Sequence, residues 1–117
     1  MKKIEAKFKL WLNTENINGA FGDGKWRLLK AIEKEGSLRA ASDILIISYR
    51  KAWGDLKKAE NALNIKLIEK HRGGNAGGRT SLTAEGKKWV KAYAKLRTEI
   101  ERATKAAHRK HFRHLQQ

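Results

Sequence analysis

The sequence predicts an α+β domain that is mainly α-helical. Three observations predict it: apolar residues recur at helical spacing over four segments, one N-terminal segment alternates like a strand, and two short strand-like segments enclose a glycine-rich loop. The 117 residues are enough for one domain, 1–117, with a modest core, and too few for two.

The first expected element is a strand over residues 4–12. In this segment five apolar residues occupy every second position, namely Ile4, Ala6, Phe8, Leu10 and Leu12. Strict alternation is typical of a half-buried strand. Residues 13–22 contain Asn, Thr and Gly, and they predict a turn or loop.

Three helices are expected next, at 24–35, 37–44 and 48–63. Asp23 is the expected N-cap of the first helix, and Gly36 is suited to end it in a left-handed conformation. Ser37 and Ser48 are the expected N-caps of the second and third helices. The third helix has an apolar face of four residues: Ala52, Leu56, Ala59 and Leu63.

Two short helices joined by a tight turn, the second beginning with polar and basic residues, predict a helix-turn-helix. After it, the segments 67–71 and 80–82 enclose the glycine-rich loop 72–79, so a hairpin wing is expected over 67–82. Thr83 then caps a long final helix at 84–113. The predicted fold is therefore a winged helix-turn-helix with an N-terminal strand and a long C-terminal helix.

The final helix carries apolar residues spaced alternately by four and three, which is the pattern of a coiled-coil seam. These residues are Trp89, Tyr93, Leu96, Ile100, Ala103 and Ala107. Packing onto the helix's own domain is the alternative, and it is expected in part for Trp89 and Tyr93. Because each residue adds about 1.5 Å of helix, the later residues lie beyond a small domain. They predict a homodimer interface.

The net charge of +15 predicts a polyanionic partner, with double-stranded DNA the main expectation and a generic anionic surface the alternative. The last 31 residues hold ten basic and two acidic side chains. The absence of Cys excludes a disulfide framework and a thiolate zinc site. No apolar run is long enough to span a membrane and no signal peptide is expected, so the sequence favours a cytoplasmic, nucleoid-associated protein.

The expected DNA contacts come from two places. In the third helix they are Ser48, Tyr49, Arg50, Lys51 and Lys57, and in the wing they are Arg72, Asn75 and Arg79. Arginine pairs with guanine or phosphate, and arginine near a wing tip suits the minor groove. The alternatives are a solvated cationic helix face and a merely flexible hairpin loop. A nucleotide-binding loop is disfavoured, since G-x-x-x-x-G-K-[ST] is absent.

No catalytic residues, cofactor or metal site are expected. Acidic side chains are few and scattered, and Ser, His and Asp form no nucleophile arrangement. His108, His111 and His114 recur every three residues, which leaves a metal site open. The interleaved Arg and Lys favour a solvated or phosphate-binding tail instead.

Taken together, these segments resemble the N-terminal DNA-binding domain of the ModE-type, molybdate-responsive regulators, relatives of the LysR-type winged helices. The resemblance extends over nearly the whole chain. It rests on residues 21–25 and 28–32, Gly36-Ser37-Leu38 with Ala40-Ala41, Ser48-Tyr49-Arg50-Lys51-Ala52-Trp53, the paired glycines 73–74 and 77–78, and Leu82-Thr83 with Gly86. It implies a dimer that binds promoter DNA through residues 48–51 and the wing, with the last helix as the dimerisation helix.

The chain departs from the family pattern in three ways. Ile46 stands in the turn where the family usually has Gly, and Gly54 lies inside the recognition helix. Nothing in the sequence resembles the family's C-terminal oxyanion-binding domain, so a response to molybdate is not implied. Two alternatives to a sequence-specific regulator remain: a sequence-neutral architectural nucleic-acid-binding protein, and a metal- or ligand-sensing switch.

Overall fold

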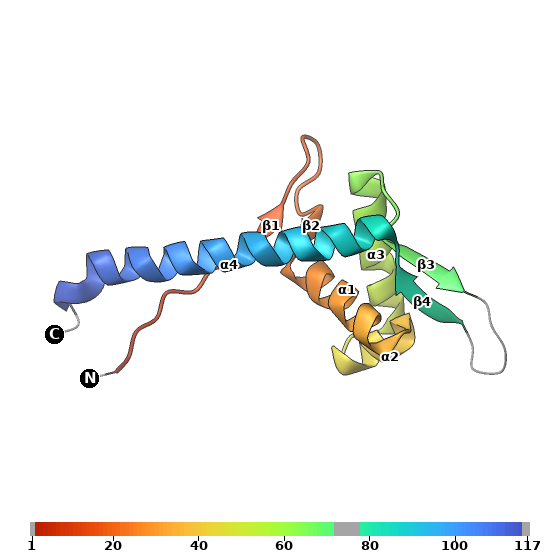
Figure 1. Ribbon diagram of the computed structural model, residues 1–117, viewed down its shortest axis with the longest axis horizontal. Helices are drawn as coiled ribbons and strands as arrows, with labels where there is room; N and C mark the ends of the chain where they lie inside the picture. The colour runs from red at the N-terminus through yellow and green to blue at the C-terminus, as the bar shows by residue number, and fades with distance from the viewer. Residues whose placement is uncertain (1, 72–77, 116–117) are drawn as a thin grey trace.

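The computed structural model describes residues 2–71 and 78–115. Its described part contains four α-helices and two separate two-stranded antiparallel sheets (Figure 1). In chain order the elements are β1 (Trp11–Leu12), β2 (Phe21–Gly22), α1 (Asp23–Glu35), α2 (Leu38–Ile44), α3 (Tyr49–Leu63), β3 (Ile68–His71), β4 (Arg79–Leu82), α4 (Ala84–Phe112) and the 3₁₀ turn η1 (Arg113–Leu115). This architecture confirms the predicted fold class, a mainly helical winged helix-turn-helix with a long C-terminal helix.

Hydroxyl side chains start three of the four helices. Ser37, Ser48 and Thr83 each accept a hydrogen bond from the backbone N–H three residues later, at the beginning of α2, α3 and α4. Gly36 ends α1 with φ 79°, in the left-handed region that glycine adopts without strain. The local sequence therefore sets these helix boundaries directly.

Asp23 does not cap α1, so that expectation is wrong. The N-cap is Gly22, and no side chain caps the helix. The Asp23 carboxylate instead accepts hydrogen bonds from the Tyr93 hydroxyl at 2.6 Å and the Arg97 guanidinium at 2.8 Å. Burial raises the pKa of Asp23, but these donors outweigh burial and hold the pKa below its ordinary value. Asp23 thus ties the start of α1 to α4.

The predicted strand over 4–12 is wrong for most of its length. Only Trp11–Leu12 forms a strand, paired antiparallel with β2. The preceding residues run beside α4 (Figure 1), with Phe8 and Leu10 half-buried and Ile4 56% exposed. Alternation indicates which side chains point toward the core. A strand also needs a neighbouring segment whose backbone N–H and C=O groups are free to form hydrogen bonds. The neighbour here is a helix, whose backbone groups are bonded internally.

One core joins all the helices. Leu28, Leu29 and Ile32 of α1 are at most 1% exposed. At the α4 side of this core, Phe21 makes edge-to-face contacts with Trp89 and Tyr93, with ring centroids 5.2 Å apart in both pairs. These contacts fix the direction of the first half of α4 relative to the helix-turn-helix.

The second half of α4 extends beyond the body formed by α1, α2 and α3 (Figure 1). The helix has 29 residues, which corresponds to roughly 44 Å. The radius of gyration is 17.6 Å, whereas a compact chain of this length has about 13 Å. The projecting half is accompanied by the N-terminal segment and leaves part of its surface uncovered.

Candidate nucleic-acid interface

The outer face of α3 is polar and cationic. The helix buries Ala52, Leu56 and Ala59 in the core, while Arg50 and Lys51 are exposed. The Lys51 ammonium is 3.1 Å from Asp55. In the described part of the chain no ion pair is found for Arg50, so its guanidinium is free to bind a base edge or a phosphate.

The turn between α2 and α3 contains a strained residue. Ile46 has φ 57° and its side chain is 90% exposed. The left-handed region is unfavourable for a β-branched residue. The turn nevertheless closes, because the Ile46 and Ile47 amides donate to the carbonyls of Asp43 and Ser42. The helix-turn-helix therefore forms without the glycine that the resemblance leads one to expect.

Strand β4 of the wing is anchored to the start of α2. The buried Thr80 donates its backbone N–H to the Gly36 carbonyl at 3.0 Å. Its hydroxyl accepts a hydrogen bond from the Leu38 backbone at 3.3 Å. The wing is thus attached to the junction of α1 and α2, at the base of the helix-turn-helix.

The segment that leads into β3 is anchored to α3 by a buried carboxylate. Glu60 is 6% exposed and accepts hydrogen bonds from the backbone of Leu67 and Ile68, at 2.8 and 3.2 Å. Its other oxygen is 3.2 Å from the Lys57 ammonium. Burial raises the pKa of Glu60, but the two backbone donors and Lys57 outweigh burial and lower the pKa below its ordinary value. Helix α3 and the wing therefore hold a fixed relative position.

Between α3 and the wing lies a surface rich in cations and aromatic rings, here called the wing-side surface. It consists of Arg39, Tyr49, Trp53, Lys57, Lys70 and Arg79. The Lys70 ammonium donates to the Tyr49 hydroxyl at 2.9 Å and lies 5.6 Å from the Trp53 ring centroid. The Arg39 guanidinium is 4.7 Å from the centroid of the Tyr49 ring. Among the described residues no ion pair is found for Arg39 or Lys70, so both remain available to an anion, whereas Lys57 is paired with Glu60.

Two hollows open on the wing-side surface. One, of about 320 Å³, is lined in part by Arg39, Lys70 and Arg79. The other, of about 530 Å³, is lined in part by Trp53, Lys57 and Lys70. Cationic hollows on both sides of Lys70 suit phosphate groups, which accept hydrogen bonds from Lys and Arg.

Sequence reasoning missed Arg39, Trp53 and Lys70 as candidate contacts. The spacing of Tyr49 and Trp53, four residues apart on α3, places both rings on one helix face. Nothing in the sequence indicates that Lys70 lies across that face, because it is 21 residues further along. Of the predicted wing residues, Arg79 is exposed at the start of β4, whereas Arg72 and Asn75 lie outside the described residues.

The predicted seam on α4 divides into two parts. Tyr93 is 2% exposed, and its hydroxyl donates to Asp23 and to the Leu10 carbonyl. Burial and the bond to Asp23 raise the pKa of the Tyr93 hydroxyl. The prediction of Tyr93 as a dimer contact is therefore wrong: its ring belongs to the core of its own domain. The periodic pattern could not show this, because a heptad pattern identifies the apolar face of a helix but not the element that packs against that face.

The other seam positions are more open. Trp89, Leu96 and Ile100 are half-buried, and Ala103 and Ala107 are exposed. Two of these seam residues, Trp89 and Leu96, line a mainly apolar hollow of about 290 Å³ together with Leu12, Ala92 and other residues. An apolar stripe of this kind, continuing from the body of the domain along the projecting helix, is suited to a second helix.

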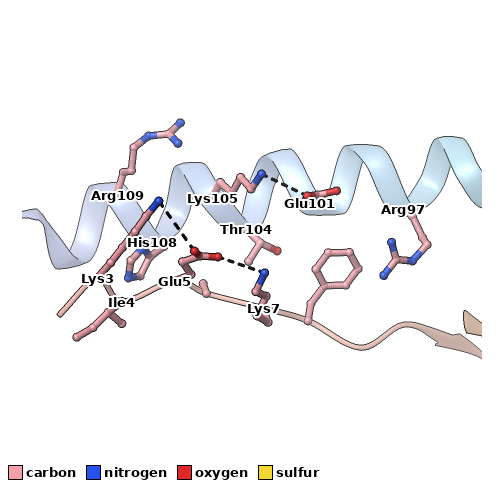
Figure 2. A pocket seen from close by; sticks show the side chains of 12 residues that line it. Lys3, Ile4, Glu5, Lys7, Arg97, Glu101, Thr104, Lys105, His108 and Arg109 are labelled. Atoms are coloured by element: carbon pink, nitrogen blue, oxygen red, sulfur yellow. Dashed lines mark ion pairs between the residues drawn. The ribbon is translucent and has the colours of Figure 1, made fainter.

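A further hollow lies between the N-terminal segment and α4 (Figure 2). Most of its charged side chains are paired with neighbours on their own segment. Glu5 is 3.2 Å from Lys7 and 4.0 Å from Lys3, and Glu101 is 3.3 Å from Lys105. Exposed pairs of this kind stabilise a fold only slightly. The hollow marks where the N-terminal segment lies beside α4, and one contact between the two is the Arg97 guanidinium, 5.0 Å from the centroid of the Phe8 ring.

The C-terminal histidines do not form a cluster in the structure. His108 is half-buried and stacks on Phe112, while His111 and His114 are exposed. Across residues 2–71 and 78–115, no group of three or more His, Cys, Asp or Glu is arranged to hold a metal ion. Over the same residues, no helix combines the length and the apolar character needed to cross a bilayer.

Comparison with known proteins places this architecture in a family. The model of the family described as "Bacterial regulatory helix-turn-helix protein, lysR family" matches residues 24–87, which extend from α1 through the wing to the start of α4. The crystal structure described as "BenM_DBD/benA site 1 DNA Complex" has a TM-score of 0.56 and 24% sequence identity, and the match covers 74% of this chain and 91% of that one. That likeness supports the fold.

Curated relatives extend the match. The molybdenum transport protein ModE of Azotobacter vinelandii is 35% identical over 95 residues, which are 81% of this chain and 35% of that protein. The transcriptional regulator ModE of Haemophilus influenzae is 34% identical over 77 residues, 66% of this chain and 30% of that protein. The chain thus spans about a third of the length of these relatives. The ModE-type resemblance is confirmed, and the chain belongs to the lysR family of bacterial regulatory helix-turn-helix proteins.

Proposed function

We propose that this chain is a transcriptional regulator's DNA-binding unit, which binds double-stranded DNA sequence-specifically as a homodimer. The observation that carries the proposal is Arg50 on the outer face of α3, which is exposed and has no ion-pair partner among the described residues, in a helix-turn-helix of a bacterial regulatory family. The first turns of such a helix face base edges in the major groove. An arginine there pairs with guanine O6 and N7.

The remaining cations contribute to affinity and register. Lys51 and the wing-side surface lie on opposite sides of the Arg50 face, and they suit the phosphates on the two edges of the major groove. The predicted wing contacts Arg72, Asn75 and Arg79 extend this binding to the backbone or the minor groove. Ser48 and Tyr49 hold the local geometry, through the N-cap and through the bond from Lys70.

The dimer is supported by the open part of the seam on α4. Leu96, Ile100, Ala103 and Ala107 would pack against the same residues of a second copy, which places two α3 helices about 34 Å apart on a roughly palindromic site. Ile100→Asp should therefore yield a monomer in sedimentation equilibrium. Thr98→Asp puts the same charge on the opposite face of α4 and should leave the dimer intact. A wild-type chain that sediments as a monomer would contradict this part of the proposal.

The function class is tested by selection from random DNA duplexes. The wild-type chain should enrich a motif with two half-sites. Arg50→Ala should weaken binding to that motif by about 1–3 kcal/mol and relax the preference at one base pair. Arg102→Ala removes an exposed arginine from α4 and is the matched control; it should change specific and non-specific binding equally. If Arg50→Ala also lowers both equally, Arg50 is a phosphate contact.

A sequence-neutral architectural protein is the second candidate. The ten basic side chains among the last 31 residues favour it, since they supply affinity without base contacts. Both candidates predict a log-log salt dependence of about 0.9 per neutralised phosphate. They differ in the selection, because an architectural protein enriches no motif. In the leading proposal the protein regulates transcription, catalyses no reaction and is located in the cytoplasm. The proposal includes no effector and no cofactor.

A further inference from the structure

The line along α3 that lies opposite its buried face is interrupted at its centre by a glycine. The residues opposite the buried face of the helix recur at spacings of four, three and four: Arg50, Gly54, Lys57 and Asn61. Gly54 thus lies one turn after Arg50 and one turn before Lys57. It is the one position on this line without a side chain.

The fold itself does not require glycine at this position. A Cβ added to Gly54 would have no atom within 4 Å, and among the described residues the positive φ angles at glycine belong to Gly19 and Gly36. At residue 86, in contrast, the fold does require glycine, since an added Cβ would clash with the Leu67 carbonyl. Within a helix, glycine is less favourable than alanine. The chain therefore keeps a locally unfavourable residue at a place where its own packing has room for a larger one.

A missing side chain at this position matters to a partner that approaches the helix closely. A helix with its side chains is about 10–12 Å across, and the major groove is about 12 Å wide. A bare backbone on the leading face lets the helix axis sit closer to the floor of the groove. The arginine one turn earlier and the lysine one turn later then reach their partners without stretching.

We propose that Gly54 is a specificity-determining position, where the edge of a base pair in the major groove approaches the main chain of α3. This inference rests on the proposed function, because it needs α3 in the groove. The base pair is selected by shape: a group that projects into the groove, such as a thymine methyl, contacts the helix backbone directly. Any side chain at residue 54 would displace that group and pull Arg50 and Lys57 away from the DNA together.

The test compares Gly54→Ala and Gly54→Leu with Gly24→Ala in the full chain. Gly24 lies in α1, is exposed, and likewise has no atom within 4 Å of an added Cβ. Thermal unfolding should show a midpoint for both alanine variants that is equal to or above that of the wild type. The binding probes are the duplex motif enriched by the wild type and a scrambled duplex of the same length.

Gly54→Ala should weaken binding to the motif about tenfold or more, Gly54→Leu should weaken it further, and neither should change binding to the scrambled duplex. Gly24→Ala should bind like the wild type. If the wild type enriches a motif and Gly54→Ala binds that motif equally well, the inference fails while the proposed function stands. If the wild type enriches no motif, the proposed function itself fails. A lower unfolding temperature for Gly54→Ala, or an equal loss of binding for Gly24→Ala, also overturns the inference.

Discussion

Replacing Ile46 by glycine should make this chain more stable, although it removes a large apolar side chain. Ile46 has φ 57°, in the left-handed region, where an L-residue with a Cβ is destabilised by about 1–2 kcal/mol. Glycine adopts that region without a steric penalty. The substitution therefore relieves strain that the turn between α2 and α3 now contains.

Two terms oppose this gain. The isoleucine side chain is 90% exposed, so the burial lost with it is about a tenth of the 1.5–3 kcal/mol for a fully buried side chain. Glycine also gives the unfolded chain more freedom, which costs about 0.5–1 kcal/mol. The net expectation is a stabilisation of roughly 0.5 kcal/mol.

Urea denaturation measures this directly. The midpoint should rise for Ile46→Gly with the slope unchanged, and the melting temperature should rise by about 2–3 °C. Ile46→Ala is the matched control: it removes the same exposed methyl and ethyl groups but keeps the Cβ, so it retains the strain and should not gain stability. A glycine variant no more stable than the alanine variant would refute the assignment of strain to this turn.

Two further predictions concern contacts that hold the elements of the fold together. Gly86→Ala should destabilise the chain by about 1–3 kcal/mol in the same urea assay, because the new Cβ meets the Leu67 carbonyl; Gly24→Ala, with open space around it, should not. Stability should also fall in acid. The pKa values of Glu60 and Asp23 lie below their ordinary values in the folded chain. The stability that these carboxylates add is therefore complete above their unfolded-state pKa. It is lost as the pH falls through their folded-state pKa. The urea midpoint should thus be flat near neutrality and decline below about pH 5. Glu60→Gln should start from a lower midpoint and decline less, and an equal decline in that variant would remove Glu60 from the explanation.

The helices could be predicted from the sequence because their determinants are local. The hydroxyls of Ser37, Ser48 and Thr83 lie three residues before the amides that they bind, and Gly36 marks a left-handed end. The periodic apolar faces follow from the 3.6-residue turn alone. For these elements no information about the rest of the chain was needed.

The errors arose where a pattern has more than one physical cause. Asp23 has the sequence position of an N-cap, but a carboxylate also attracts arginine, and Arg97 lies 74 residues away. Tyr93 fits a heptad seam, yet the same helix face meets Phe21 and the core before it reaches solvent. In residues 4–12 every second side chain is apolar, but most of this segment lies beside helix α4 and has no strand to pair with. Each of these features depends on which segments meet in three dimensions.

The cations of α3 differ in whether a carboxylate pairs with them, and the sequence does not show this difference. Lys57 is counted as a DNA contact by its place in the sequence, but it is also paired with Glu60, the carboxylate that holds the wing at Leu67. A phosphate that recruits Lys57 therefore competes with the anchor of the wing, whereas one that recruits Arg50 competes with nothing in the described residues. Specific binding should then depend first on Arg50. Lys57 should add to the affinity only if Glu60 keeps its hydrogen bonds to the backbone of Leu67 and Ile68 after the Lys57 ammonium has moved to a phosphate.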